Sequence, residues 1–488
     1  MGIQLDWQVE SERQRQHATE DPEARRARQK RRRQMAVAVL SLAVVVCTVL
    51  GVILWRLQSV EDRLRQDLLD TVDAEVVALR IGDQTSYMEI RRIASDYWLD
   101  LQRQQFEEYQ RLKDSGQLEL TGNVLSVEMD IDEQRARVVV EERINGIPYE
   151  VAWFYWNYTD GDQSGWRRVP PDVSFWGDSR TANANNVRVQ YEALDDQFAE
   201  ALLAVVGRWW SEGCVWLNCQ TPLPRLNIEI DPRTYADPAW DLYDEWKLVV
   251  TSPLYNGRVR RDRQLDPTLE IFLAEMLAGR IVNHGLGPET SFNPLPYSET
   301  TAYADTAWLR EALESWLVGR FTGDETRGSA FISNVAAQYG DHVPGGLLAG
   351  LEPGARIGPI WQTATGLAIS DLSVEQLNLM DWREYFAWRL GLEVRILSNA
   401  LDLDPTQQRI QHDALYDETD PNALIAADAV RVSFIPGQGP YAVQMLNFSV
   451  DQGGGLLATV DYLTDANDPS TVNTAVFRWI GTTWKRVS

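Results

Sequence analysis

The chain has 488 residues, 44% of them hydrophobic, and a formal net charge of −25. This length allows two or three domains, and the hydrophobic fraction allows each of them to bury a core. Residues 1–34 hold nine basic and six acidic residues, a local charge of +3, so the remainder carries −28. A body this acidic repels nucleic acid and anionic lipid, so we expect neither to be a partner of the folded part.

The N-terminal segment predicts a membrane anchor. Residues 1–34 are polar and lack apolar periodicity, which is typical of a disordered tail. Residues 35–55 contain no charged side chain, and a helix of that length, at ~1.5 Å per residue, spans a bilayer core of ~30 Å. We therefore predict one transmembrane helix over residues 35–55. A cleaved signal peptide is the alternative, but no small-x-small cleavage motif is present.

A basic cluster precedes this helix and consists of Arg25, Arg26, Arg28, Lys30, Arg31, Arg32 and Arg33. An excess of Lys and Arg beside a span marks its cytoplasmic side. We therefore expect a single-pass protein of the cell membrane, with a cytoplasmic N-terminus and the bulk of the chain outside the cytoplasm.

The next segment changes from helical to strand-like periodicity. Apolar residues recur every three or four positions in residues 56–82, which predicts a stalk helix that docks on its own domain. A second amphipathic helix is expected at residues 87–113. From residue 118 the period is two, and strands are expected at 118–128, 135–144, 149–158 and 166–169. Asn145-Gly146 is a strong hairpin signal between two of these strands.

Helices followed by a meandering sheet indicate an α+β domain. The details resemble the cone fold of the nuclear transport factor 2-like (SnoaL-like) family over residues 83–178. The resembling motifs are Gly82-Asp83, the helix with Trp98 and Phe106, Gly122-Asn123-Val124, Gly146-Ile147-Pro148-Tyr149 and Gly165-Trp166-Arg167-Arg168-Val169-Pro170. The resemblance implies a possible ligand pocket between helices and sheet, a feature that members often have. We interpret the aromatic residues of the third strand, Trp153 to Tyr158, as packing residues, with a pocket as the alternative.

Residues 179–360 predict a central α+β domain with strands at 187–191 and 225–230 and a helix at 192–210. Cys214 and Cys219 are the only cysteine pair outside the predicted span. In an oxidising exterior compartment we interpret them as a small-loop disulfide. Half of a zinc site is the alternative, although no second pair is present to complete it.

Two further helices, expected at residues 269–280 and 306–318, resemble the active-site helices of the gluzincin metallopeptidases, in particular the bacterial peptidase MA-like group. The resemblance places the zinc motif His-Glu-x-x-His on Ala274-Glu275-Met276-Leu277-Ala278. It implies that Glu275 occupies the position of the general base and Glu311 that of the glutamate ligand on the second helix. Both histidine positions are alanine, and alanine has no lone pair to offer a metal ion. A base without a metal-bound water has no nucleophile to generate, so we expect no catalytic residue, no metal and no cofactor.

The four histidines do not replace the missing ligands. His17 lies in the predicted tail, His284 beyond the first of the two helices, His342 in a Gly/Pro-rich loop and His412 beside Asp413. None has ligand spacing to another, so we interpret them as structural or solvated.

Residues 361–488 show the same succession of helix, strands and closing motif as residues 83–178. A helix is expected at 374–397 and strands at 430–434, 441–450, 456–462 and 472–479. The closing motif Thr483-Trp484-Lys485-Arg486-Val487 is similar to Gly165-Trp166-Arg167-Arg168-Val169. We predict a second nuclear transport factor 2-like domain that arose by duplication.

Three functions remain open. The leading hypothesis is a membrane-anchored exterior binding or scaffold protein, whose inactive peptidase-like domain takes an exterior protein or peptide ligand. A metal-dependent hydrolase that uses Glu275 and Glu311 with non-standard ligands is the first alternative. The second is a sensor of a small molecule or envelope component that uses an aromatic pocket.

Overall fold

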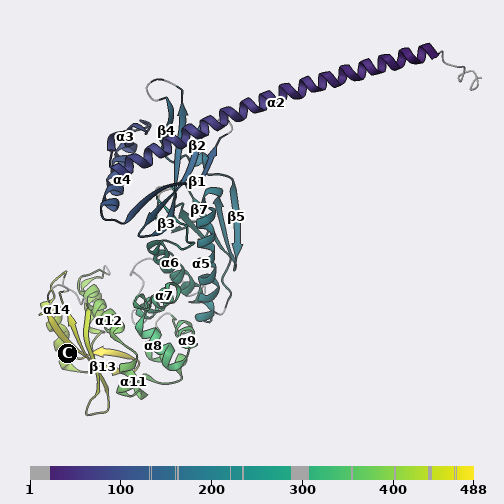
Figure 1. Cartoon of the computed structure of the whole chain (residues 1–488). Coiled ribbons are helices and arrows are strands. Elements are labelled where there is room, and N and C mark those ends of the chain that lie inside the picture. The colour runs from purple at the N-terminus through teal and green to yellow at the C-terminus, as the bar shows by residue number, and fades with distance from the viewer. Residues whose placement is uncertain are drawn as a thin grey trace, which may run out of the picture. The chain divides into compact units, whose positions relative to one another are not determined.

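The computed structural model describes residues 22–488, except positions 131, 133, 160, 162–163, 220, 234–235, 256, 287–306, 353–354, 401–402, 438–441, 466–467 and 469. The fold is mixed α+β, as the sequence predicts. The chain divides into two compact units, shown in one cartoon in Figure 1. Unit 1 contains Met1–Val140 and Trp153–Pro170. Unit 2 contains Glu141–Ala152 and Pro171–Ser488.

The longest element is α2 (Pro22–Ile81), the long purple helix of Figure 1. Within the described part of the chain, it is the one helix that is long and apolar enough to cross a membrane. None of its most apolar window is buried against protein, which fits the uniformly apolar residues 35–55. The predicted tail lies outside the described residues up to position 21, whereas residues 22–34 belong to α2.

The last third of α2 belongs to the core of unit 1. Leu68, Val72, Val76 and Leu79 recur at the spacing of one helical face, and all four are buried. Residues 56–82, expected to form a stalk, therefore enter the core at Leu68, and α2 runs without interruption from the apolar segment into this core.

The rest of unit 1 follows a simple order of elements, in which the hairpin Glu141–Ala152 between the second and third strands is grouped with unit 2. Two helices, α3 (Gln84–Glu89) and α4 (Asp96–Asp114), precede β1 (Leu118–Met129), β2 (Arg135–Ile144), β3 (Ile147–Tyr158) and β4 (Gly165–Val169). The strands pair in the order β1-β2-β3, with β4 antiparallel to β3. Asn145 and Gly146 both have positive φ, as a tight hairpin turn requires. The single helix expected at residues 87–113 is two helices, because Ser95 caps a new helix by accepting from the backbone N–H of Trp98.

Unit 2 begins with a βαβ arrangement. The strands are β5 (Ser179–Ala184), β6 (Val187–Glu192), β7 (Leu226–Asp231), β8 (Ala239–Trp240) and β9 (Lys247–Thr251), in the order β5-β6-β7-β9-β8. The three central strands are parallel, and α5 (Asp196–Trp216) is the crossover from β6 to β7. The edge strands β5 and β8 are antiparallel to their neighbours. A short strand, β10 (Val259–Arg260), pairs with residues 149–150 of β3.

A layer of helices follows, consisting of α6 (Pro267–Leu286), α7 (Ala307–Thr322), α8 (Ala330–Tyr339), α9 (Val343–Ala349), α10 (Ile357–Thr365) and α11 (Val374–Leu379). Helix α6 packs against α5 and α7, and α7 packs against α8. Short 3-10 turns lie at Val173–Phe175, Ala193–Asp195, Glu325–Arg327 and Ile369–Asp371.

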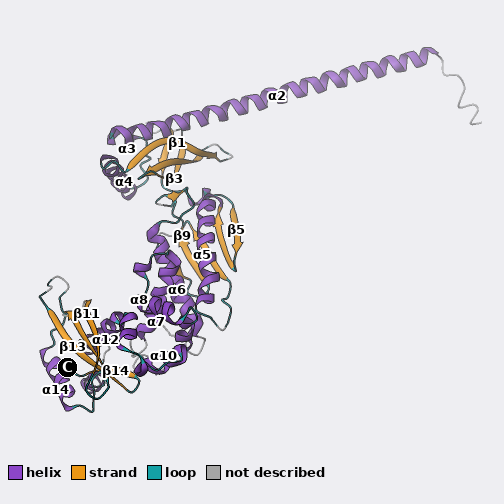
Figure 2. Cartoon of the chain, turned by 60° about the horizontal axis from the view of Figure 1, so that its bottom comes forward, coloured by secondary structure: helices purple, strands orange, loops and turns teal. Residues whose placement is uncertain are grey.

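The C-terminal region of unit 2 contains α12 (Arg383–Leu397), α13 (Pro405–Asp413), α14 (Pro421–Ser433), β11 (Ala442–Val450), β12 (Leu456–Leu463), β13 (Val472–Ile480) and β14 (Thr483–Arg486). The four strands form an antiparallel meander, drawn in orange in Figure 2. Two predictions were wrong here. The helix expected at 374–397 is broken at Asp381, which has positive φ. The strand expected at 430–434 is the end of α14, which starts from the cap Asp420 and Pro421.

Unit 1 and the C-terminal region of unit 2 share an order of elements. In each, a long helix is followed by a short helix, a bridge residue, another helix and four strands. Arg91 forms an isolated parallel bridge with Arg168 of β4, and Tyr416 forms the corresponding bridge with Arg486 of β14. The tryptophans of the two closing motifs, Trp166 and Trp484, are both buried.

Candidate functional site

Helix α6 carries the residues that the sequence prediction aligns with a zinc motif. Asp266 precedes the helix, and its carboxylate accepts from the backbone N–H of Thr268 at 2.9 Å, so the helix begins where the Asp-Pro signal predicts. Ala274 and Ala278 lie one turn apart and are both fully buried, with 0% exposure. Glu275, which is next to Ala274 and hence turned by ~100° about the helix axis, is exposed.

On α7, Glu311 is also exposed. Partial desolvation by the surrounding protein raises the pKa of Glu311, against the opposing effect of Arg395. The acidic side chain of α7 that lies against α6 is Glu314. A Cβ placed on Gly279 of α6 would lie 3.9 Å from the carboxylate carbon of Glu314, and this carboxylate accepts from Arg310 Nε at 2.9 Å. The two glutamates of the predicted motif thus face solvent, and a third, paired glutamate faces α6.

The described residues around these helices do not supply the donors that a metal ion needs. Among the residues that the structure describes, there is no group of three or more His, Cys, Asp and Glu side chains that could hold a metal ion. His284 Nε2 lies 3.1 Å from Thr221 Oγ1, and its ring meets the edge of Trp246. His342 directly precedes α9, and His17 lies outside the described residues.

Cys214 and Cys219 form a disulfide at the C-terminal end of α5. The bond closes a short loop, and Cys219 lies beside Gly285 at the end of α6, where an added Cβ would be 3.6 Å from the sulfur. Both cysteines are therefore occupied by each other and offer no thiolate to a metal ion.

The first of two buried ionic networks lies in unit 1. Glu75 of α2 accepts from Arg91 Nη2 at 2.7 Å and from the Tyr155 hydroxyl at 2.7 Å, and Arg168 Nη1 lies 3.5 Å away. Glu75 and Arg91 are almost fully buried. Burial alone would raise the pKa of Glu75, but the charges of Arg91 and Arg168 lower it overall. Arg91 also donates to Gln102 of α4 at 2.8 Å, so the network joins α2, α4 and the sheet.

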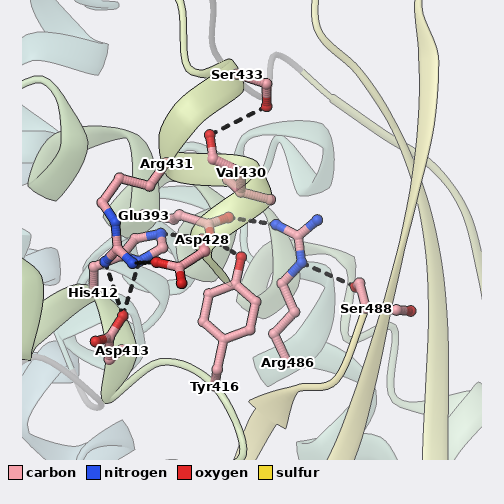
Figure 3. A network of polar contacts seen from close by, with 10 residues as sticks. All are labelled: Glu393, His412, Asp413, Tyr416, Asp428, Val430, Arg431, Ser433, Arg486 and Ser488. Carbon is pink, nitrogen blue, oxygen red and sulfur yellow. Dashed lines mark hydrogen bonds and ion pairs between the residues drawn. The ribbon is translucent and has the colours of Figure 1, made fainter. Parts of the chain in front are cut away.

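The second network lies in the C-terminal region of unit 2 and is drawn in Figure 3. Glu393 of α12 accepts from Arg486 Nη1 at 2.5 Å and from the Tyr416 hydroxyl, and His412 Nε2 lies 3.3 Å from it. Burial alone would raise the pKa of Glu393, but the charge of Arg486, the nearby ring of His412 and the hydrogen bond from Tyr416 lower it to about 2.

His412 connects this buried carboxylate to the surface. Its ring is fully buried, and its Nδ1 lies 3.7 Å from Asp413 Oδ1. Asp413 in turn accepts from Arg431 Nη1 of α14 at 2.9 Å, as Figure 3 shows. The chain of contacts from Arg486 to Arg431 thus joins β14, α12, α13 and α14.

Both networks have the geometry of structural clamps. In each, a glutamate of the long helix meets the second basic residue of the closing motif, Arg168 or Arg486. A buried carboxylate paired in this way has its charge compensated and both oxygens bonded, so it offers no free base to a substrate. The networks explain the recurring Trp-basic-basic-Val motif, because alternate residues of a strand point to the same face, which places the tryptophan and the second basic residue together.

Sequence analysis did not identify Glu75 and Glu393. The available signal was a charged residue inside the apolar stripe of a helix, since Glu75 directly precedes the buried Val76 and Glu393 follows the buried Leu392. Their partners could not be assigned, because Arg168 and Arg486 follow more than 90 residues later in each case.

No family model matches the chain, and no curated protein and no solved structure matches it either. Function is therefore inferred from the residues and contacts of this chain.

Proposed function

We propose that this protein is a single-pass membrane protein whose exterior part is a binding or scaffold module without catalytic activity. The apolar segment of α2 supports anchoring, and the basic cluster at residues 25–33 supports a cytoplasmic N-terminus. The disulfide between Cys214 and Cys219 supports an oxidising, exterior location for unit 2.

The non-catalytic role is inferred from the residues that α6 carries at the motif positions and from their burial. The two positions that would supply zinc ligands are alanines with 0% exposure, and the glutamate between them points away into solvent. A working zincin needs two nitrogen donors at these positions and a carboxylate close to the metal-bound water. On this proposal, residues 179–360 form a peptidase MA-like domain without peptidase activity.

We also propose that residues 83–178, completed by the buried end of α2 from Leu68 onward, and residues 361–488 form nuclear transport factor 2-like domains related by duplication. The shared order of elements, the matching bridges and the paired Glu–Arg clamps support this relation. Tyr87, Phe106 and Tyr155 are buried beside the clamp of unit 1, which favours a packed interior over an aromatic ligand pocket.

The partner of the exterior module is proposed to be a basic protein or peptide. The residues after the apolar segment carry the whole net charge of −28, because residues 35–55 are uncharged. A surface of this sign attracts cationic partners and repels anionic ones, with a strength that falls as salt is added.

The test is the metal content of the full-length protein, purified in detergent, loaded with zinc and dialysed. We expect no stoichiometric zinc, and the same background in the wild type and in the variants Glu275→Ala and Glu311→Ala. One zinc per chain that is lost in Glu311→Ala would overturn the proposal and identify the site as a metal-dependent hydrolase.

A further inference from the structure

The basic cluster is built into the same helix as the membrane segment. Residues 25–33 contain seven basic residues and otherwise only Ala27 and Gln29, and the next acidic residue after Glu23 is Glu61. The structure places all of them on α2, with every side chain from position 25 to 33 exposed. The cations are thus fixed on a helix that continues directly into the apolar segment.

The axial positions of these cations match a lipid headgroup layer. At ~1.5 Å per residue, Arg33 lies ~3 Å and Arg25 ~15 Å before Met35, where the apolar run starts. The headgroup layer on each side of a bilayer is roughly 5–7 Å thick. Arg31 to Arg33, at ~3–6 Å, therefore lie within the layer. The long side chains of Lys30 and the earlier arginines extend toward it.

One face of this segment is a shallow groove between basic side chains. It is lined by Arg26, Lys30 and Arg33, which follow the spacing of one helical face, together with Val37 at the start of the apolar run. Along the helix axis the basic residues precede the apolar Val37 and Ala38. This order matches a phospholipid, in which the phosphate lies outside the acyl chains. Six of the seven cations are arginines, which bind phosphate oxygens with two parallel N–H groups.

We propose that residues 25–33 form a binding surface for anionic phospholipid headgroups in the leaflet next to the N-terminus. The proposal rests on the membrane anchoring proposed above. The basic residues 25–33 attract anionic lipids, whereas the residues after the apolar segment, with their net charge of −28, repel them. Because α2 is continuous from Pro22 into the core of unit 1, headgroups bound at this end also fix the depth of the helix and hence of unit 1.

The experiment uses the full-length protein in nanodiscs of equimolar phosphatidylcholine and phosphatidylglycerol, with the lipids that remain bound after release counted by native mass spectrometry. We expect the wild type to retain roughly five times as much phosphatidylglycerol as phosphatidylcholine, or more. This ratio corresponds to the attraction of a single Lys or Arg to an anionic membrane surface. The variant Arg26→Gln/Lys30→Gln/Arg33→Gln is expected to retain both lipids in nearly equal amounts.

The matched control removes the same charge elsewhere. Arg63, Arg65 and Arg103 are exposed and lie beyond the apolar segment, so Arg63→Gln/Arg65→Gln/Arg103→Gln is expected to keep the wild-type ratio. Equal retention of both lipids by the wild type, or full enrichment in the Arg26/Lys30/Arg33 variant, would overturn the proposal.

Extraction of vesicles at alkaline pH separates this proposal from the anchoring on which it rests. If the wild type is washed off the vesicles, the membrane anchor itself is wrong and the lipid site falls with it. If the protein stays inserted but shows no lipid preference, only the lipid site is overturned.

Discussion

The carboxylate of Glu393 is held by residues that are distant in the sequence. Arg486 follows it by 93 residues and Tyr416 by 23. Because the pKa of Glu393 in the folded protein, about 2, lies below its ordinary value of 4.5, the ionised carboxylate stabilises the fold. This contribution is complete above pH 4.5 and is lost as the pH falls toward 2.

We therefore predict that Glu393→Gln destabilises the protein by roughly 3 kcal/mol near neutral pH, and that the difference from the wild type shrinks between pH 4.5 and 2. Denaturant unfolding of the solubilised protein, followed by tryptophan fluorescence at several pH values, measures this difference. Glu352→Gln is the control, because Glu352 is an exposed residue outside the network, where a substitution changes the free energy of unfolding by less than about 0.5 kcal/mol. A difference for Glu393→Gln that does not change with pH would contradict the assignment.

At the scale of elements, the clamp of unit 1 ties α2 to β4. Removing the carboxylate in Glu75→Ala leaves the cations of Arg91 and Arg168 buried without their partner. We predict a loss of about 3–5 kcal/mol in the unfolding free energy of unit 1. Asp70→Ala, an exposed position on the same helix, is expected to change it by less than about 0.5 kcal/mol. Equal effects of the two substitutions would show that Glu75 is not part of a clamp.

The elements themselves were largely predictable where the local pattern decides the structure. The strand at 472–480 buries Ala475 and Phe477, which lie two residues apart, as the period of a strand requires. The strand at 135–144 is buried along most of its length and ends at Asn145-Gly146, a turn that requires the positive φ these two residues tolerate. The long apolar helix was predictable for the same reason, since its length and composition lie within one continuous stretch.

The prediction errors arose where tertiary packing or a single residue determines the structure. Val430-Arg431-Val432 alternates like a strand, yet α14 buries Ala423 and Ala427 at a spacing of four, and the sequence does not show which pattern prevails. Asp381 breaks the expected long helix although it is neither Gly nor Pro. The clamps were missed because each pairs a helix with a strand that follows much later in the chain, and no local signal contains that pairing.

At the scale of the whole molecule, the proposed membrane topology places the basic and the acidic parts of the chain on opposite sides of the membrane. The cationic residues 25–33 lie on one side of the apolar segment, and the −28 charges of the following residues lie on the other. This distribution agrees with the excess of Lys and Arg that is typical of the cytoplasmic side of a span. The enzymatic alternative would require ligand atoms that α6 and α7 do not carry at the motif positions.

The most direct test is protease protection of the full-length protein in intact spheroplasts, with one epitope at the N-terminus and another at the C-terminus. The account predicts that added protease destroys the C-terminal epitope and leaves a short membrane-bound fragment with the N-terminal epitope. Lysis of the spheroplasts should expose that epitope as well. Protection of the C-terminal epitope in intact spheroplasts would contradict the account, because the acidic units would then lie inside the cell.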